Sequence, residues 1–234
     1  MSAFNFDVNN IELGGKPIIE QCEFSVSSGD LVAFIGPSGC GKTTMLNTVA
    51  GLLSFDHIQT RQVDNLSYIF QEPRLIPWLT VSQNLTLINP DLTPERCEEL
   101  LNQVELNNCA DAFPNQLSGG MQKRVSIARA FARLPSLVLL DEPFSSLDKP
   151  TAKALHALLL SLLNQYQTAA VLVTHDLSEA IALADEIVFL STQPMNIIRR
   201  YAVPLCKFER TPEFIQSVLE DLQTESPELL KGKA

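Results

Sequence analysis

The residues best suited to chemistry form one glycine-rich run. The run matches the pattern GxxxxGK[ST] and consists of Gly36, Pro37, Ser38, Gly39, Cys40, Gly41, Lys42 and Thr43. Its glycines let the backbone curl until successive N–H groups point at phosphate oxygens, and the N-terminus of a following helix adds partial positive charge. Lys42 is expected to reach the β- and γ-phosphates of a nucleotide, and the Thr43 hydroxyl to bind Mg²⁺. An apolar segment precedes the run and a helical segment begins at Thr44, so a plain strand-to-helix turn is the weaker interpretation.

A pair of carboxylates follows a second apolar segment. Residues 137–140 read Leu-Val-Leu-Leu, and Asp141 and Glu142 come directly after them. A carboxylate at the end of a buried strand can hold Mg²⁺ or its water, which suits Asp141. Glu142 is placed to polarise an attacking water. Taken alone, Asp-Glu at a strand end usually means only solvated charge, and the phosphate loop upstream gives this pair its significance.

A second anion site is indicated where Ser118, Gly119 and Gly120 precede a long helical segment. The hydroxyl, the glycine N–H groups and the helix N-terminus would all face phosphate. Taken alone, Ser-Gly-Gly is more often a turn or a helix cap. One sheet edge cannot easily present two phosphate-binding helices to the same nucleotide, so the second site is better explained as serving the nucleotide of another subunit.

Two further polar residues each follow a short apolar segment, Gln71 and His175. A Gln near Mg²⁺ can ligate the metal or order a water, and a His can contact the γ-phosphate. In isolation each is usually a solvated strand end. His57 and His156 have no motif around them and are assigned structural roles. Cys40 needs no catalytic role, and its thiol would be oxidisable only if exposed.

The elements that must position these groups follow from the apolar pattern. Four short apolar segments predict buried strands at 31–35, 137–140, 170–173 and 187–190. They lack alternation, as expected when a parallel sheet is covered on both faces. Leu155, Leu158, Leu159 and Leu162 follow helical spacing, and Asp176 with Glu179 resembles a capping box, so helices are predicted between the strands. The predicted fold class is α/β, a P-loop NTPase core with a mostly parallel sheet, a small antiparallel β lobe and a helical subdomain.

Two regions depart from this alternation. Residues 1–30 are short β-like segments broken by glycines, and residues 80–134 are predicted to be helical. Within the latter, Thr93 can cap a helix, and one face of that helix carries Cys97, Leu100, Leu101 and Val104. A further helix is expected at 213–222. We therefore expect one domain over 1–234, with the lobe at 1–30, the helical subdomain at 80–134 and a C-terminal extension at 191–234.

Composition excludes several function classes. The chain has 234 residues, 17 basic and 27 acidic, for a net charge of −10, which argues against a broad nucleic-acid-binding face. The first eight residues do not resemble a secretory signal, and no apolar run approaches the ~20 residues of a spanning helix. The five cysteines show no CxxC spacing, which favours a reduced, cytoplasmic compartment. A membrane role is therefore expected only through a partner.

In their order along the chain, these motifs resemble those of the nucleotide-binding subunits of the ATP-binding cassette (ABC) family. Walker A is 36–43, the Q-loop starts at Gln71, the signature is 117–122, Walker B is 137–141 followed by Glu142, the D-loop is 146–148 and the switch histidine is His175. The resemblance implies ATP hydrolysis with Glu142, His175 and Lys42 as catalytic residues. It implies Mg²⁺ ligation by Thr43, Gln71 and Asp141.

The resemblance also implies partners. Two copies would sandwich two ATP molecules head to tail as a homodimer, with Ser118 and Gly120 on the partner's γ-phosphate. The helical region after Gln71 would dock a short helix of a transmembrane permease. The chain would thus lie at the cytoplasmic face of the inner membrane, peripheral through that permease, with an extracytoplasmic substrate-binding protein as an indirect partner and no nucleic acid.

Three segments are similar to one branch of this family, the nitrate, sulfonate and taurine importers, which includes importers of a pyrimidine precursor of thiamine. They are 70–81, 201–205 and 210–214. The chain departs from the family in two ways. The stretch expected to hold an adenine-stacking aromatic offers only Ile11 or Leu13, which predicts weaker affinity or looser base selectivity. The spans 51–70 and 79–117 are also shorter than is typical.

Two alternatives use the same motifs differently. A soluble ABC ATPase that acts on DNA or ribosomes generally needs tandem cassettes or a long coiled-coil insertion, and neither fits in 234 residues. A regulatory nucleotide-binding module with little catalysis would explain the missing aromatic, yet every phosphate- and metal-facing position is filled. The transported molecule is not encoded in this chain, because selectivity in an importer resides in the permease and the binding protein.

Overall fold

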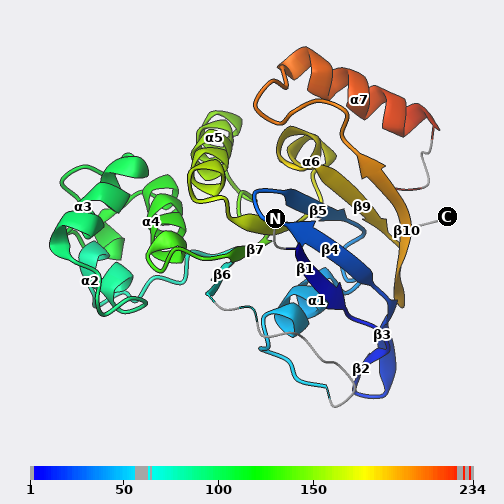
Figure 1. Cartoon of the computed structure of the whole chain (residues 1–234), viewed down its shortest axis with the longest axis horizontal. Coiled ribbons are helices and arrows are strands. Elements are labelled where there is room, and N and C mark those ends of the chain that lie inside the picture. The colour runs from blue at the N-terminus through cyan, green and yellow to red at the C-terminus, as the bar shows by residue number, and fades with distance from the viewer. Residues whose placement is uncertain (1–2, 56–62, 64, 226–228, 230–231, 233–234) are drawn as a thin grey trace. The chain divides into compact units, whose positions relative to one another are not determined.

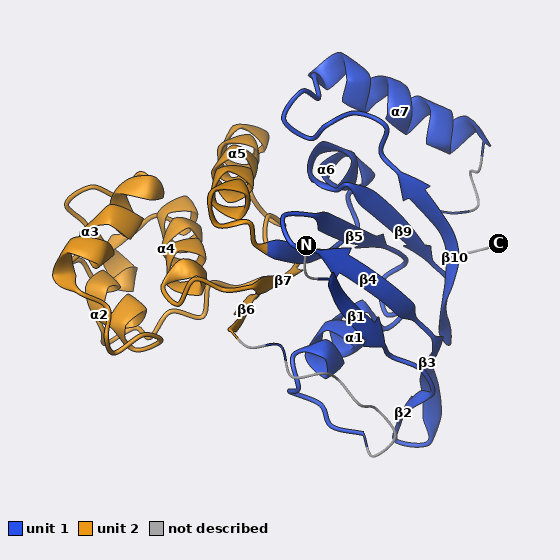
Figure 2. Ribbon diagram, in the orientation of Figure 1, with its two compact units in different colours: residues 1–63, 169–234 blue, residues 64–168 orange. Residues whose placement is uncertain are grey.

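The computed structural model describes residues 3–55, 63, 65–225, 229 and 232, so His57 and part of the span 51–70 lie outside the described residues. The helices and strands are labelled in Figure 1. The chain forms two compact units, residues 1–63 with 169–234 (unit 1) and residues 64–168 (unit 2), which Figure 2 shows in different colours. The expectation of a single domain over 1–234 stays a prediction, and each unit is described by itself below.

Unit 1 is built on a mixed sheet. Its strands, in spatial order, are β2 (Ile11–Leu13), β3 (Lys16–Gln21), β10 (Met195–Ala202), β9 (Glu186–Leu190), β5 (Leu31–Ile35) and β8 (Ala169–Thr174). Strand β5 runs parallel to both β8 and β9, and every residue of β5 and β8 is buried. This confirms the strands predicted at 31–35, 170–173 and 187–190. The continuous apolar segments are the central strands because they have no solvent-facing side.

The antiparallel part of unit 1 is divided between two sheets. Strands β1 (Ala3–Asp7) and β4 (Glu23–Ser27) pair only with each other, and Phe24 of β4 packs edge-on against Phe34 of β5 at 4.8 Å between ring centroids. The β2–β3 hairpin belongs instead to the larger sheet, because β3 pairs in parallel with β10. That pairing joins segments about 175 residues apart, and local pattern does not reveal it.

Three helices complete the described part of unit 1: α1 (Lys42–Val49), α6 (Leu177–Leu183) and α7 (Pro212–Glu225). Helix α6 contacts β5, β8 and α7, and Figure 1 shows α7 beside it. The helix predicted at 213–222 is confirmed within α7. Arg210 donates hydrogen bonds of 2.7 Å to the carbonyls of Ile181 and Ala184, so it satisfies the C-terminal end of α6.

The capping box predicted at the N-terminal end of α6 is only partly present. Asp176 is the N-cap, and its Oδ1 accepts from the N–H groups of Ser178 and Glu179 at 2.8 and 3.2 Å. The reciprocal bond of a capping box is absent from these described residues, so that part of the prediction was wrong. The N–H of Asp176 donates instead to the Thr174 hydroxyl, which in turn donates to the Glu179 carboxylate. The last residue of β8 therefore occupies both groups that the box would have joined.

Unit 2 combines two strands with a helical region. Strands β6 (Leu66–Ile69) and β7 (Leu137–Asp141) are parallel, which confirms the strand predicted at 137–140. The helices are α2 (Val81–Thr86), α3 (Pro94–Gln103), the 3₁₀ helix η1 (Pro114–Gln116), α4 (Gly119–Phe131) and α5 (Lys149–Tyr166). Helix α4 contacts α2, α3, α5 and β6, so it lies at the centre of this unit.

The expectation that residues 80–134 are wholly helical was only partly right, because non-helical connections at 87–93 and 104–113 separate the helices. The predicted cap and apolar faces are confirmed. Thr93 caps α3 by accepting from the N–H of Arg96. The predicted apolar faces are buried, Cys97, Leu100, Leu101 and Val104 for α3, and Leu155, Leu158, Leu159 and Leu162 for α5. Among the described residues no helix has both the length and the apolar character needed to cross a bilayer.

Candidate nucleotide site

The phosphate loop leaves β5 and ends at α1, as its sequence context predicts. Gly41 is the N-cap of α1 with φ 118°, a conformation that other residues rarely adopt. A Cβ on Gly36 would lie 2.9 Å from Leu190 Cβ, so only glycine fits between the loop and the end of β9. These two glycines therefore set the curl of the loop.

Lys42 lies inside this loop. Its side chain is 5% exposed, and Nζ donates to the carbonyls of Gly36 at 2.7 Å and Pro37 at 2.8 Å. The backbone atoms that shape the loop thus also hold the cation that would face a phosphate. Ser38 and Gly39 are exposed, and Thr44 is half-buried.

Two other side chains of the loop differ in exposure. Thr43, for which the sequence predicts a metal role, is an exposed residue. Cys40 is 2% exposed, and burial raises the pKa of its thiol. The condition for an oxidisable Cys40 is therefore not met in this conformation.

His175 leaves the sheet beside the phosphate loop. Strands β5 and β8 are paired with Ile35 opposite Thr174, so Gly36 and His175 are the next residues at the same edge of the sheet. The imidazole is exposed. This arrangement brings His175, the predicted switch histidine, and the loop to neighbouring strand ends, where ligands of parallel α/β sheets bind.

The two candidates for base contact are distinguished by burial. Ile11 is fully buried in the core, whereas Leu13, at the end of β2, is 40% exposed. Only Leu13 can offer an apolar surface to a purine.

In unit 2 the residues predicted to lie near a metal or the attacking water share one edge of the paired strands. The register of β6 and β7 places Ile69 opposite Leu140, so Gln71, Asp141 and Glu142 follow paired positions at the carboxyl ends of adjacent strands. Gln71 is exposed, and the two acidic residues are half-buried. Unit 2 therefore brings Gln71, Asp141 and Glu142 to one edge of its paired strands, and their roles toward a metal or a water stay a prediction.

Two details of this edge were not foreseen from sequence. The Tyr68 hydroxyl donates to Asp141 Oδ2 at 3.3 Å, and burial, followed by the charge of Asp141, raises the pKa of the phenol. Glu142 has φ 44°, a left-handed backbone that costs on the order of 1 kcal/mol. Its carbonyl accepts from Ser145 Oγ at 2.9 Å, which fixes this turn.

The signature residues lie at the start of α4. Ser118 is the N-cap, and its hydroxyl accepts from the N–H of Met121 at 3.3 Å. Ser118 and Gly119 are exposed, and a Cβ on Gly120 would lie 3.2 Å from Thr151 Cγ2. The helix-cap interpretation and the anion-site interpretation are thus compatible, because the capping serine still faces solvent.

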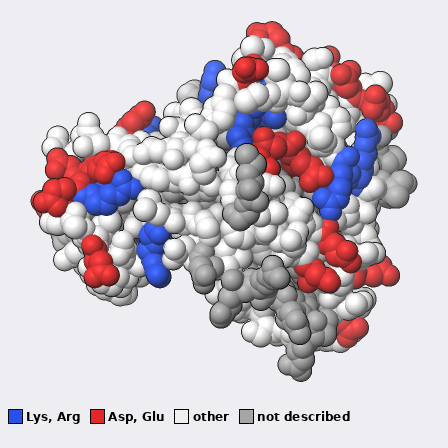
Figure 3. Space-filling model, viewed as in Figure 1, with Lys and Arg blue, Asp and Glu red and all other residues white. Residues whose placement is uncertain are grey.

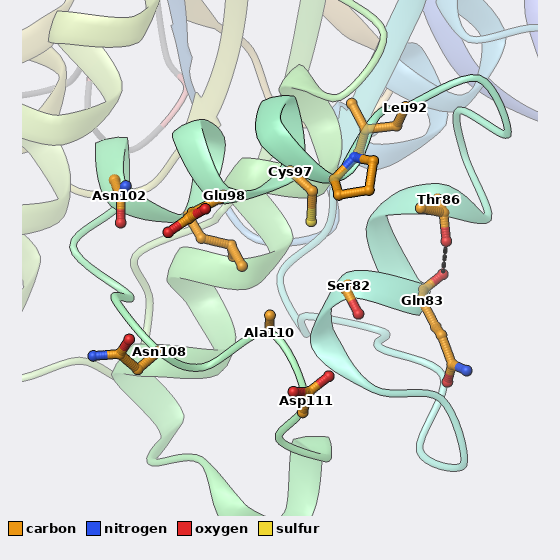
Figure 4. A pocket seen from close by; sticks show the side chains of 12 residues that line it. Ser82, Gln83, Thr86, Leu92, Cys97, Glu98, Asn102, Asn108, Ala110 and Asp111 are labelled. Atoms are coloured by element: carbon orange, nitrogen blue, oxygen red, sulfur yellow. Dashed lines mark hydrogen bonds between the residues drawn. The ribbon is translucent and has the colours of Figure 1, made fainter.

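Unit 2 also contains a pocket of about 680 Å³ in its helical region. Figure 4 shows Ser82, Gln83 and Thr86 from α2, Cys97, Glu98 and Asn102 from α3, and Asn108, Ala110 and Asp111 from the following connection. Apolar walls come from Leu92 and Leu101, and charge comes from Glu98 and Asp111. Trp78, in the segment before α2, is 74% exposed.

The segment before α2 is held by Asn84, another residue that sequence reasoning missed. Asn84 is fully buried, its Oδ1 accepts from the N–H of Ile76 at 2.8 Å, and its Nδ2 donates to three carbonyls between residues 76 and 80. Thr80 and Gln83 form a capping box on α2. That box is visible in the sequence as Thr-Val-Ser-Gln and would have located the helix start.

Comparisons with known proteins now decide the family. The model of the family described as ABC transporter matches residues 19–145, more than half of the chain. The chain belongs to the ABC transporter family. The match includes every predicted site residue except Leu13 and His175.

Curated relatives cover most of this cassette. The aliphatic sulfonates import ATP-binding protein SsuB 1 of Pseudomonas syringae is 40% identical over 206 residues, with 87% of each chain covered. The protein SsuB of Bacillus subtilis, with the same descriptive name, is 40% identical over 233 residues, with 92% of this chain and 91% of its own covered.

A solved structure resembles the cassette as well. The dimeric structure of a post-hydrolysis state of the ATP-binding cassette MJ0796, bound to ADP and Pi, matches with a TM-score of 0.70 and 29% identity. The alignment covers 88% of this chain and 100% of the chain in that structure. The chain is thus an ATP-binding ATPase of the P-loop α/β class, and the regulatory-module and non-transport alternatives are not favoured.

Proposed function

We propose that this cassette powers an importer of the sulfonate, nitrate and taurine branch, with aliphatic sulfonates as the first cargo to test. Relatives named as aliphatic sulfonates import ATP-binding proteins align over most of the chain at about 40% identity, and this similarity carries the importer assignment. The pyrimidine precursor of thiamine, taurine and nitrate remain the competing cargoes.

The hydrolytic roles follow the geometry of each unit. Lys42 and the loop residues Gly36 to Thr44 would bind the ATP phosphates, with Leu13 against the base. Glu142 would orient the attacking water and His175 would contact the γ-phosphate. Positioning and charge stabilisation are the main demands of phosphoryl transfer, and these residue types supply both.

Thr43, Gln71 and Asp141 are the proposed ligands of Mg²⁺. A hydroxyl, an amide carbonyl and a carboxylate are all oxygen donors, which suit this hard cation. Gln71 and Asp141 follow paired positions at one sheet edge, and Tyr68 orients the Asp141 carboxylate. The ion, when bound, neutralises charge on the phosphates.

Dimerisation is proposed to complete the site. Ser118, Gly119 and Gly120 are solvent-facing or half-buried at the N-terminus of α4, where a phosphate of the partner's ATP would be attracted. The dimeric form of MJ0796 supports a two-copy arrangement in general. A homodimer of this chain, with each signature serving the other copy's nucleotide, is the specific proposal.

The pocket between α2 and α3 is the proposed docking site for a short helix of a transmembrane permease. Leu92, Cys97 and Leu101 offer an apolar floor, and Glu98 and Asp111 favour a helix that carries a basic residue. The chain would thereby lie at the cytoplasmic face of the inner membrane, and an extracytoplasmic binding protein would deliver cargo to the permease.

Nucleic acid is not among the proposed partners. The net charge is −10, and several basic side chains are occupied by acidic neighbours, such as Lys207 with Asp185 at 2.7 Å. On the face seen in Figure 3, basic and acidic side chains are interspersed. Nucleic-acid binding requires an extended basic surface.

Uptake by complemented cells tests this function. In cells that lack the gene, the wild-type chain should restore uptake of a radiolabelled aliphatic sulfonate, and Glu142→Gln should restore none. The purified variant should lose at least about 100-fold in ATP turnover while still binding ATP, because only the water-orienting carboxylate is changed. Glu209→Gln, at an exposed position outside the proposed site, is the matched control.

The uptake and turnover measurements distinguish three outcomes. Uptake of taurine, nitrate or the pyrimidine in place of the sulfonate would reassign the cargo. Full turnover by Glu142→Gln would contradict the role given to that residue. If the wild-type chain restores uptake of none of the four cargoes, the importer assignment would be contradicted.

A further inference from the structure

The loop that follows β6 is bound along its backbone by side chains of α4. Arg129 donates from its two terminal nitrogens to the carbonyls of Arg74 and Pro73, each at 2.8 Å. Lys123 Nζ donates to the carbonyl of Gln71. Three carbonyls within four residues of this loop (residues 71–74) are therefore held by one helix.

Lys123 is an unusual residue for this task because it is only 7% exposed. Burial lowers the pKa of its ammonium, and the nearby charge of Glu72 acts in the opposite direction. Burying a charge is unfavourable unless hydrogen bonds compensate it. An apolar side chain of similar length would fill this position without that cost, so the specific contribution of Lys123 is the bond to Gln71.

The other side of loop 71–74 is held by aromatic contacts. The guanidinium of Arg74 lies 3.9 Å from the centre of the Phe70 ring, which stacks on Tyr68 at 4.2 Å. Arg74 has φ 46°, a left-handed backbone that is uncommon for a residue with a side chain. Tyr68 in turn donates to Asp141. Loop 71–74 is thus contacted both by side chains of α4 and, through Arg74, by the aromatic pair Phe70 and Tyr68.

We propose that Lys123 and Arg129 are positioning residues that fix Gln71 to the helix that begins at Ser118. Gln71 is proposed to face the metal beside the copy's own nucleotide, whereas Ser118 is proposed to face the partner's nucleotide. The two residues would then move together as one element. This inference rests on the proposed function, since it gives Gln71 a role toward Mg²⁺. Neither Lys123 nor Arg129 is among the residues proposed to contact ATP or Mg²⁺.

The Mg²⁺ dependence of ATP hydrolysis tests this proposal. Lys123→Met removes the donor and keeps an unbranched apolar stem in its place. We expect its apparent KM for Mg²⁺ to rise about 10-fold, the scale seen when a partner of a metal ligand is removed, with a smaller change in kcat. Arg129→Met should behave alike, and Arg129→Lys, which keeps a donor, should recover part of the loss.

Lys153→Met is the matched control, because Lys153 is an exposed residue on α5. The thermal midpoint of each variant and its binding of ATP without Mg²⁺ should stay near the wild-type values. A Mg²⁺ dependence unchanged in both Lys123→Met and Arg129→Met would overturn the inference. If Lys123→Met does not fold, the comparison of Arg129→Lys with Arg129→Met decides. Absence of hydrolysis by the wild-type chain would contradict the proposed function instead.

Discussion

At the scale of single residues, Lys42 shows how the phosphate loop prepares a charge. Its buried ammonium donates to the carbonyls of Gly36 and Pro37. An ammonium carries three donors. Within the described part of the chain these carbonyls take two of them, and the third suits a phosphate oxygen. The loop therefore holds its cation in place through the same backbone that would bind phosphate.

The cysteines give a prediction at this scale. Cys22, Cys40 and Cys97 are buried with raised thiol pKa values, about 12 for Cys22, chiefly because burial disfavours the thiolate. Alkylation requires the thiolate. At pH 8 iodoacetamide should modify exposed Cys206 first and half-buried Cys109 next, as measured by peptide mass spectrometry. All five should react in urea, and early labelling of Cys40 in the folded protein would contradict the buried geometry.

The raised pKa of Cys22 also affects the stability of the chain against unfolding. An unfolded thiol ionises near pH 8.5, whereas Cys22 stays protonated in the folded chain until about pH 12. Its contribution to stability is therefore complete below about pH 8.5 and decreases as the pH rises from there toward 12, because the unfolded state loses its proton first.

At the scale of elements, helix ends decide where the site residues lie. Asp176 caps α6 directly after His175, and Ser118 caps α4 within the signature. A cap fixes where the regular hydrogen bonds start, so it also fixes the direction in which the preceding residue leaves the strand. The capping residues are thus both structural and adjacent to the proposed chemistry.

Removal of the α6 cap is predicted to be measurable. Asp176→Ala should lower the free energy of unfolding by about 1 kcal/mol, which corresponds to a fall of about 2–4 °C in Tm for a chain of this size. Asp176→Asn should stay near wild type, because an Asn side chain caps as well. Asp221→Ala, at an exposed position on α7, controls for loss of an acidic side chain. Equal Tm values for all variants would show that the cap contributes nothing.

The elements also show what sequence can predict. Strands with continuous apolar residues, such as β5 and β8, and the helix capped by Thr93 were predictable because their signals are local. The parallel pairing of β3 with β10 and the bond from Lys123 to Gln71 were not, because they join distant segments. The capping box from Asp176 to Glu179 was wrong because Thr174, on the preceding strand, competes for both partners.

Some residues of the candidate site could likewise be proposed from the sequence, and others could not. The phosphate loop has a specific spacing of its own, and Asp141, Glu142 and Ser118 gain their significance from their order along the chain after it, so each could be proposed by residue from the sequence. The supporting residues Tyr68 and Arg129 were missed, because a tyrosine on a strand and an arginine on a helix have many ordinary explanations. Only contact with Asp141 or with loop 71–74 distinguishes them.

At the scale of the whole molecule, a single copy contains both the residues proposed for its own nucleotide and those proposed for a partner's. Ser118 performs a second task as well, because it caps α4. Simple removal of the serine would therefore confuse loss of partner contact with loss of the cap. A substitution that keeps the cap separates the two.

ATP-dependent dimerisation is the corresponding prediction. With ATP, Glu142→Gln should elute as a dimer in size-exclusion chromatography, because nucleotide that is bound and not hydrolysed keeps the copies together. Adding Ser118→Asp should return it to a monomer of unchanged Tm, since Asp caps as well as Ser but repels phosphate. A dimer that persists in the double variant would exclude the proposed role of Ser118 toward the partner's nucleotide.

Trp78 is the only tryptophan in the chain, and its indole is 74% exposed in the segment that leads into α2. The molecule thus carries a single tryptophan fluorophore, a few residues before the helix that lines the proposed docking pocket. A permease that covers this segment would move the indole from water to an apolar environment and shift its emission to shorter wavelength. Assembly of the transporter would then be followed in real time by the intrinsic fluorescence of this tryptophan, without any attached label.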